Sequence, residues 1–139
     1  MKHILHIIGF FIIFTGCKTN QSRLAKTVNL IGETELVGYV SNNQKSGMKW
    51  LLKNMDDDDK NSLTAGFLVD NCKYAYEAWK STPWGSVNDS LFFEYVLPYS
   101  SLNERRDNWR KDFHERFSPI VKNANSAYEA AAILNNNIF

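Results

Sequence analysis

Reactive side chains are scarce in this chain, which has two cysteines and three histidines. His3 and His6 lie in the apolar N-terminal segment, so His114 is the one imidazole in the rest of the sequence. The sequence has no pair of histidines at zinc-ligand spacing, no Gly-rich phosphate loop, no G-x-S-x-G elbow and no C-x-x-C motif. We therefore predict no catalytic residues, no cofactor and no metal site in this chain. Carboxylates are plentiful, and the sequence neither supports nor excludes a paired-acid site of the glycosidase kind.

The chain also has almost no net charge. Its formal charge is +1, and removal of a leader containing Lys2 brings the remainder to zero. Because such a surface has no field that would attract nucleic acid or acidic lipid, we predict no nucleic-acid partner. Hydrophobic residues make up 44% and charged residues 22% of the sequence, which is typical of a globular protein and argues against wholesale disorder. A length of 139 residues allows one domain.

The N-terminal segment has the layout of a signal peptide. Lys2 gives it a basic start, and an almost unbroken apolar run extends from Ile4 to Phe14. At ~1.5 Å per residue this run covers only about half of a ~30 Å hydrocarbon layer, which disfavours a membrane-spanning helix. The motif Phe14-Thr15-Gly16-Cys17 resembles the lipobox of bacterial lipoproteins, although Phe14 replaces the usual Leu. The resemblance implies lipid attachment at Cys17; the alternative is an ordinary secretory signal with an incidental cysteine.

This interpretation divides the chain into a lipoprotein signal peptide (1–16), a polar tether (17–22) and a helical domain (23–139). We predict an exported protein whose lipid anchors it in the cell envelope, since a multiply acylated N-terminus is a stable membrane anchor. The tether has no acidic run, which favours an anchor facing the periplasm. Lipidation of Cys17 would leave Cys72 without an intramolecular disulfide partner, and we expect Cys72 to have a packing role.

From Leu24 onward the apolar residues repeat with a helical period, which predicts a mainly α fold, a small irregular bundle of about five to seven helices. The clearest rows are these: Met48, Leu51, Leu52 and Met55; Leu68, Cys72, Ala75 and Trp79; Trp109, Phe113 and Phe117. Ser62 is the expected cap of the longest helix, and the four acids from Asp56 to Asp59 predict a solvated loop. A thiolate pair of Cys72 and His114 is disfavoured, because Cys72 lies in mid-helix and His114 on a charged face.

Aromatic residues amount to 14% of the chain, with four Trp. The simpler interpretation is a small core filled with large rings. The alternative is a groove that binds a glycan or a peptide, since rings stack on sugars and extended chains. The residues that we predict for such a groove are Trp84, Tyr95, Tyr99, Trp109 and Arg110.

Three segments resemble a known family. They are Trp79-Lys80-Ser81-Thr82-Pro83-Trp84-Gly85, Phe92-Phe93-Glu94-Tyr95-Val96-Leu97-Pro98-Tyr99 and Trp109-Arg110. Together they resemble the helical region that precedes the catalytic core in bacterial transglutaminase-like lipoproteins of the papain-like superfamily. Trp50-Leu51-Leu52-Lys53-Asn54-Met55 resembles an earlier helix of that family. The similarity extends from about Met48 to Leu134.

The resemblance implies a membrane-anchored, non-catalytic helical module whose partner is a transglutaminase-like core with a Cys, His and Asp triad. That core is absent from this sequence, and Cys72 does not match the setting of the nucleophile. Ser100 and Arg105 depart from the residues that the family pattern leads us to expect. A last helix that ends on Ile138-Phe139, without Gly, Pro or a polar tail, predicts a chain truncated within a larger protein; an apolar C-terminus docked on the core is the alternative.

Overall fold

The computed structural model describes residues 19–81, 88–100 and 105–138. Over these residues the chain is helical and contains no strand, only an isolated bridge between Thr27 and Thr64. This confirms the predicted mainly α bundle. The elements are α2 (Val28–Ile31), α3 (Glu33–Gly38), the 3-10 helix η1 (Asn42–Gln44), α4 (Lys45–Asn54), α5 (Asp57–Ser62), α6 (Ala65–Ser81), α7 (Asp89–Leu91), the π-helix η2 (Phe92–Val96), α8 (Trp109–Val121) and α9 (Ala127–Ile138).

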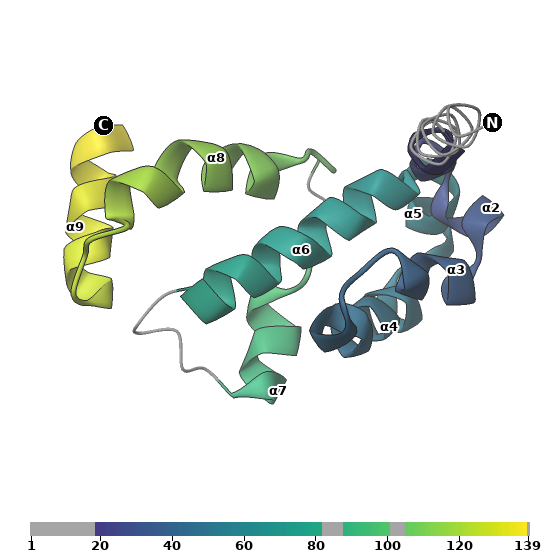
Figure 1. The fold of residues 1–139 in the computed structure, drawn as a ribbon, viewed down its shortest axis with the longest axis horizontal. Helices are drawn as coiled ribbons and strands as arrows, with labels where there is room; N and C mark the ends of the chain where they lie inside the picture. Colours follow the sequence, from purple (N-terminus) through teal and green to yellow (C-terminus); the bar gives the residue numbers. More distant parts are fainter. Residues whose placement is uncertain (1–18, 82–87, 101–104, 139) are drawn as a thin grey trace, which may run out of the picture.

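The longest of these helices, α6, runs through the middle of the molecule (Figure 1). Helices α2 to α5 gather around its N-terminal half, and α7 with η2 lies below its C-terminal half. Helix α8 packs on α6 and diverges from it toward the end of the molecule opposite α2 and α5. Helix α9 packs on α8 at that end, away from α2 to α5.

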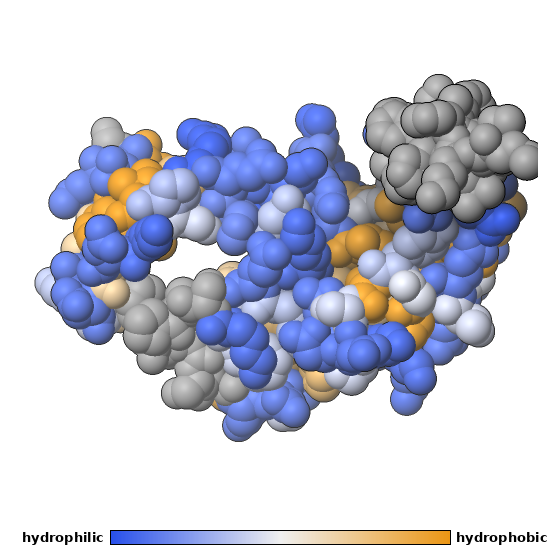
Figure 2. All heavy atoms as spheres, in the orientation of Figure 1, coloured by the Kyte–Doolittle hydropathy of each residue, from blue (hydrophilic) through white to orange (hydrophobic). Residues whose placement is uncertain are grey.

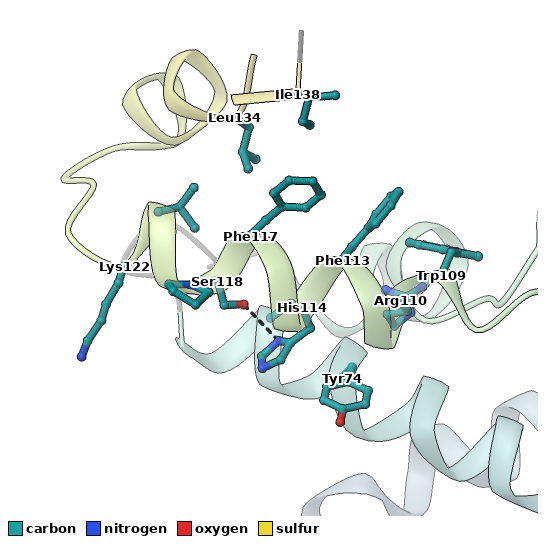
Figure 3. A pocket seen from close by; sticks show the side chains of 13 residues that line it. Tyr74, Trp109, Arg110, Phe113, His114, Phe117, Ser118, Lys122, Leu134 and Ile138 are labelled. Atoms are coloured by element: carbon teal, nitrogen blue, oxygen red, sulfur yellow. Dashed lines mark hydrogen bonds between the residues drawn. The ribbon is translucent and has the colours of Figure 1, made fainter. Parts of the chain in front are cut away.

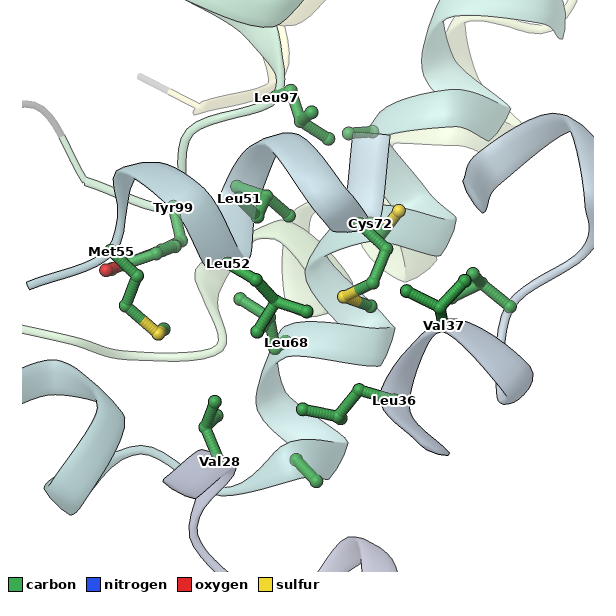
Figure 4. Packing of buried hydrophobic residues seen from close by; sticks show 14 of the residues in the cluster. Val28, Leu36, Val37, Leu51, Leu52, Met55, Leu68, Cys72, Leu97 and Tyr99 are labelled. Carbon is green, nitrogen blue, oxygen red and sulfur yellow. The ribbon is translucent and has the colours of Figure 1, made fainter. Parts of the chain in front are cut away.

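The main core forms where the apolar faces of α4 and α6 meet. Met48 and Leu51 of α4 are at most 2% exposed, and Leu68 and Cys72 of α6 are fully buried. These residues belong to the apolar rows predicted from the sequence, and their side chains converge with those of the other helices (Figure 4). Three or four apolar residues in every two turns give each helix one continuous apolar stripe, which burial against the other stripe stabilises.

Aromatic rings of α6 and η2 pack against each other at one side of the core. Phe92 is fully buried and stacks on Trp79, with ring centroids 4.1 Å apart and planes at 14°. Tyr76 meets Phe92 edge-on at 4.8 Å. The Leu97 N–H donates to the Phe92 carbonyl at 2.8 Å, and this i to i+5 bond gives η2 its π-helical turn. The core interpretation of the aromatic residues therefore holds for this part of the chain.

The acidic run is not a loop, so that prediction was wrong. Asp56 caps α5, and its carboxylate accepts a hydrogen bond from the Asp59 N–H at 2.7 Å. The next three acids occupy the first turn, where the positive end of the helix dipole offsets their mutual repulsion. The predicted cap of the longest helix was wrong as well, because α6 begins at Ala65 and the Thr64 hydroxyl accepts from the Phe67 N–H at 3.2 Å.

The substitution Leu68→Ala is expected to lower the free energy of unfolding by about 2 to 5 kcal/mol, because it removes a fully buried side chain and leaves a cavity. Urea denaturation would measure this loss. Leu30→Ala is the matched control, since Leu30 is 70% exposed and its loss should change stability by less than about 0.5 kcal/mol. Equal losses for the two variants would contradict the assignment of the core.

Candidate functional site

A pocket of about 740 Å³ lies between α6, α8 and α9 (Figure 3). This volume is within the range of small-molecule sites. In the space-filling view, apolar atoms gather on α8 and α9 beside an opening that faces α6 (Figure 2). The residues that line the pocket are Tyr74, Ala78, Trp109, Arg110, Phe113, His114, Phe117, Ser118, Pro119, Val121, Lys122, Leu134 and Ile138.

An aromatic row on α8 forms one wall of the pocket. Trp109, Phe113 and Phe117 contact one another edge to face, with centroids 5.7 and 5.5 Å apart. Phe113 keeps 48% of its surface exposed and Trp109 keeps 37%. The row therefore borders open space, unlike the rings below α6. Leu134 and Ile138 of α9 lie beside the same row (Figure 3).

His114 connects α8 to α6 at the edge of the pocket. Its Nδ1 lies 3.1 Å from the Ser118 hydroxyl, and its Nε2 lies 3.4 Å from a Glu77 carboxylate oxygen. The imidazole also packs on the Tyr74 ring at 4.9 Å. The imidazole is half-buried.

Ser118, His114 and Glu77 have the side-chain types of a catalytic triad. The 3.4 Å separation of His114 and Glu77 is longer than a normal hydrogen bond. Ser118 stands in the last turns of α8, where helix formation uses the backbone N–H groups, and the following Pro119 has none to offer. The described residues thus place no oxyanion-binding N–H beside Ser118. We interpret Ser118, His114 and Glu77 as a polar contact that holds α8 against α6.

Arg110 fixes the beginning of α8. Its Nε donates to Asn71 Oδ1 at 2.9 Å, and its Nη2 donates to the carbonyls of Val96 at 2.7 Å and Pro98 at 3.1 Å. The buried Asn71 amide in turn donates to the Leu97 carbonyl at 2.8 Å. Burial lowers the pKa of Arg110 to about 10. The guanidinium is thus held rigidly by neutral acceptors.

The Cys72 thiol is sealed in the core. It is fully buried and donates a weak hydrogen bond to the Gln44 carbonyl at 3.7 Å. Burial raises its pKa to about 12, although the charge of Arg110 acts in the opposite direction. A thiol in this setting stays protonated at neutral pH and is not a nucleophile.

Tyr99 belongs to a second buried polar contact. Its hydroxyl donates to Asp59 Oδ2 at 2.7 Å, and Arg106 Nε lies 3.1 Å from the same oxygen. Burial, followed by the hydrogen bond to Asp59, raises the pKa of Tyr99. This contact connects α5 to the segment before α8.

The five predicted groove residues occupy different places. Trp109 and Arg110 line the pocket. Tyr99 lies in the core at 9% exposure, and Tyr95 projects from η2 at 76% exposure. Trp84 lies outside the described residues, so a groove that uses all five remains a prediction.

Sequence reasoning missed most of the pocket. Phe113 and Phe117 belong to a predicted helical row that was not assigned to a site, and Ile138 was assigned only to the end of the last helix. The available signal was a pair of amphipathic faces in consecutive helices, since Leu134 and Ile138 are also four residues apart. Which face of α9 meets α8 is decided by packing that the pattern does not specify.

The predicted membrane anchor lies outside the part of the chain that the structure describes. Cys17 and the leader lie outside the described residues, so the lipid site stays a prediction. Among the helices that the structure describes, none has both the length and the apolar character needed to cross a membrane. The described ranges also contain no cluster of three or more His, Cys, Asp or Glu side chains that could hold a metal ion.

Comparison of the chain with protein-family models, with curated proteins and with solved structures gave no match.

The buried thiol predicts a specific pH dependence. The pKa of Cys72 rises from its ordinary value of 9.0 to about 12 on folding, so the neutral thiol favours the folded state. This contribution to stability is fully present below pH ~9 and is lost as the pH rises toward ~12, because only the unfolded state ionises readily. Urea unfolding of the wild type and of Cys72→Ala across this range should show a larger alkaline loss in the wild type. Parallel losses would contradict the assigned shift.

Proposed function

We propose that this chain is a membrane-anchored lipoprotein whose helical domain is the non-catalytic region that supports a transglutaminase-like core. The observation that carries this proposal is the role of the aromatic residues on which the family resemblance rests. Trp79 and Phe92 stack on each other, and Trp50 stacks on Phe93 at 6.2 Å. The resembling segments thus build the scaffold of the domain.

The state of Cys72 also supports a non-catalytic role. A transglutaminase-like reaction needs a cysteine thiolate that reaches an amide carbonyl. Cys72 is fully buried and its pKa is raised to about 12 by burial. The thiol therefore contributes to packing in this proposal, and the nucleophile belongs to the partner core.

Export and anchoring complete the proposal. The leader and the Gly16-Cys17 pair favour lipid attachment at Cys17, and residues 19–22 of the predicted tether are helical, in the first described turns at 19–24. The domain is held at the envelope membrane and faces the periplasm. The absence of a net charge after the leader is removed leaves the lipid as the source of membrane affinity.

Metabolic labelling of bacteria with an alkyne-tagged fatty acid would test the anchor. The wild-type chain and Cys72→Ala should take up the label and sediment with membranes. Cys17→Ser should lose both properties, because no thiol remains at the lipobox to receive the lipid. A labelled Cys17→Ser protein, or a wild-type protein that never takes up label, would contradict lipid attachment at Cys17.

The partner core is tested by the DNA that follows codon 139. We expect a downstream reading frame that encodes a transglutaminase-like core with Cys, His and Asp at triad positions. Co-expression of that product with this chain should give a complex that purifies together. Unrelated downstream sequence would count against the proposed support of a core and would leave the lipid-anchor result unaffected.

A second candidate function is a binding module. It is favoured by the pocket between α6, α8 and α9, where aromatic residues remain partly exposed beside a cavity of about 740 Å³. Pockets of this size with mostly apolar walls and few polar groups are typical of small-ligand sites. The sequence suggested a glycan or a peptide as the ligand of the aromatic residues.

A further inference from the structure

Arg110 carries a charge that no described side chain neutralises. All of its hydrogen-bond partners are neutral, namely the Asn71 side chain and the carbonyls of Val96 and Pro98. The ion pairs of the described residues do not include Arg110. Nε and Nη2 are occupied, which leaves Nη1 as a donor. A partly buried cation without a counter-ion is costly, and an anion beside it would be stabilised.

The pocket that Arg110 lines has a basic character. Lys122 is the other charged residue of the lining, and no Asp or Glu belongs to it. Glu77 lies behind the imidazole of His114, at 3.4 Å from Nε2. An anionic group beside Arg110 would therefore meet one cation and no carboxylate of the lining, because Lys122 lies at the far end of the pocket from Arg110 (Figure 3).

The shape and walls of the pocket favour an alkyl chain as the rest of the ligand. The lining follows α8 from Trp109 to Val121, a distance of about 18 Å at ~1.5 Å per residue. Arg110 lies beside Trp109 at one end, while Leu134 and Ile138 lie farther along the row (Figure 3). A glycan or a peptide would need many hydrogen-bond partners, and two of the few polar groups, Ser118 and His114, already bond to each other.

We propose that the pocket binds a single-chain amphiphile, a fatty carboxylate whose head group accepts from Arg110 Nη1 and whose tail lies along Phe113 and Phe117. This inference rests on the second candidate function, the use of the pocket as a binding site. It replaces the glycan or peptide by a ligand with one acidic head and an unbranched apolar body. Burial of the tail supplies affinity, and the charge-assisted bond to the guanidinium supplies selectivity for the acid.

The test is an NMR titration of the full chain with decanoate, with decanol and acetate as controls. Decanoate should bind saturably and shift the Nε–Hε signal of Arg110 together with the amide signals of Phe113 and Phe117. Decanol lacks the charge and should bind about tenfold more weakly, and acetate lacks the tail and should not saturate. Equal affinities for decanoate and decanol, or shifts outside the pocket, would overturn the proposal.

Paired variants separate charge from shape. Phe113→Gln and Phe113→Glu remove the same partly exposed ring, and only the second adds a carboxylate to the pocket. Decanoate should bind Phe113→Glu about tenfold more weakly than Phe113→Gln, whereas decanol should bind both alike. Tyr128→Glu is the matched surface control, since Tyr128 is 86% exposed and does not line the pocket. An unchanged decanoate affinity in Phe113→Glu would refute the proposed site.

Arg110→Lys tests the contribution of the guanidinium to binding. Because Arg110 also holds the first turn of α8 in place, circular dichroism first establishes whether this variant folds. A folded variant that binds decanoate more weakly and decanol as before supports the proposal. If this variant unfolds, the Phe113 pair decides the case.

The experiments distinguish a wrong ligand class from a pocket that binds no ligand. Peptides or glycans that shift the pocket signals, without any response to decanoate, would overturn the fatty carboxylate alone. No response to any of these compounds would refute both.

Discussion

The Arg110 guanidinium is the contact on which the arrangement of the C-terminal half depends. It joins Asn71 on α6 to the carbonyls of Val96 and Pro98 and belongs itself to the first turn of α8. Since Asn71 also bonds to the Leu97 carbonyl, the end of η2, the middle of α6 and the start of α8 are held together by one polar network. Such a network is stabilising only when its members are satisfied together. The direction in which α8 leaves α6, and hence the pocket, follows from it.

The two halves of the molecule use their aromatic residues differently. Below α6, the rings of Phe92, Trp79 and Tyr76 pack on one another and close the core. On α8, Phe113 and its neighbours contact one another along one helix and border a cavity. The first arrangement supports the scaffold role that we propose, and the second supports ligand binding. A helical domain of this kind can combine both properties because the core residues and the pocket residues Tyr74 and Ala78 lie on different faces of α6.

The sequence predicts the buried faces correctly where the apolar residues of a helix repeat with the helical period. The rows through Met48 on α4 and Leu68 on α6 are buried as their helical spacing predicts. The acidic run was misinterpreted because charge repulsion was given more weight than capping, although Asp56 bonds to the Asp59 N–H at 2.7 Å. The burial of Tyr99 depends on Asp59, forty positions away in the chain, and no periodic pattern specifies such a pair.

The sequence by itself determined the mainly helical class, the apolar faces of the long helices and the lack of a recognisable set of reactive side chains. These are local properties, fixed by the spacing and type of neighbouring residues. Tertiary structure alone decided that Cys72 is sealed from solvent, that Arg110 has only neutral partners, and that Phe113 borders a cavity with Ile138. Each of these facts depends on which helices meet and at what angle, and many distant contacts set that geometry together.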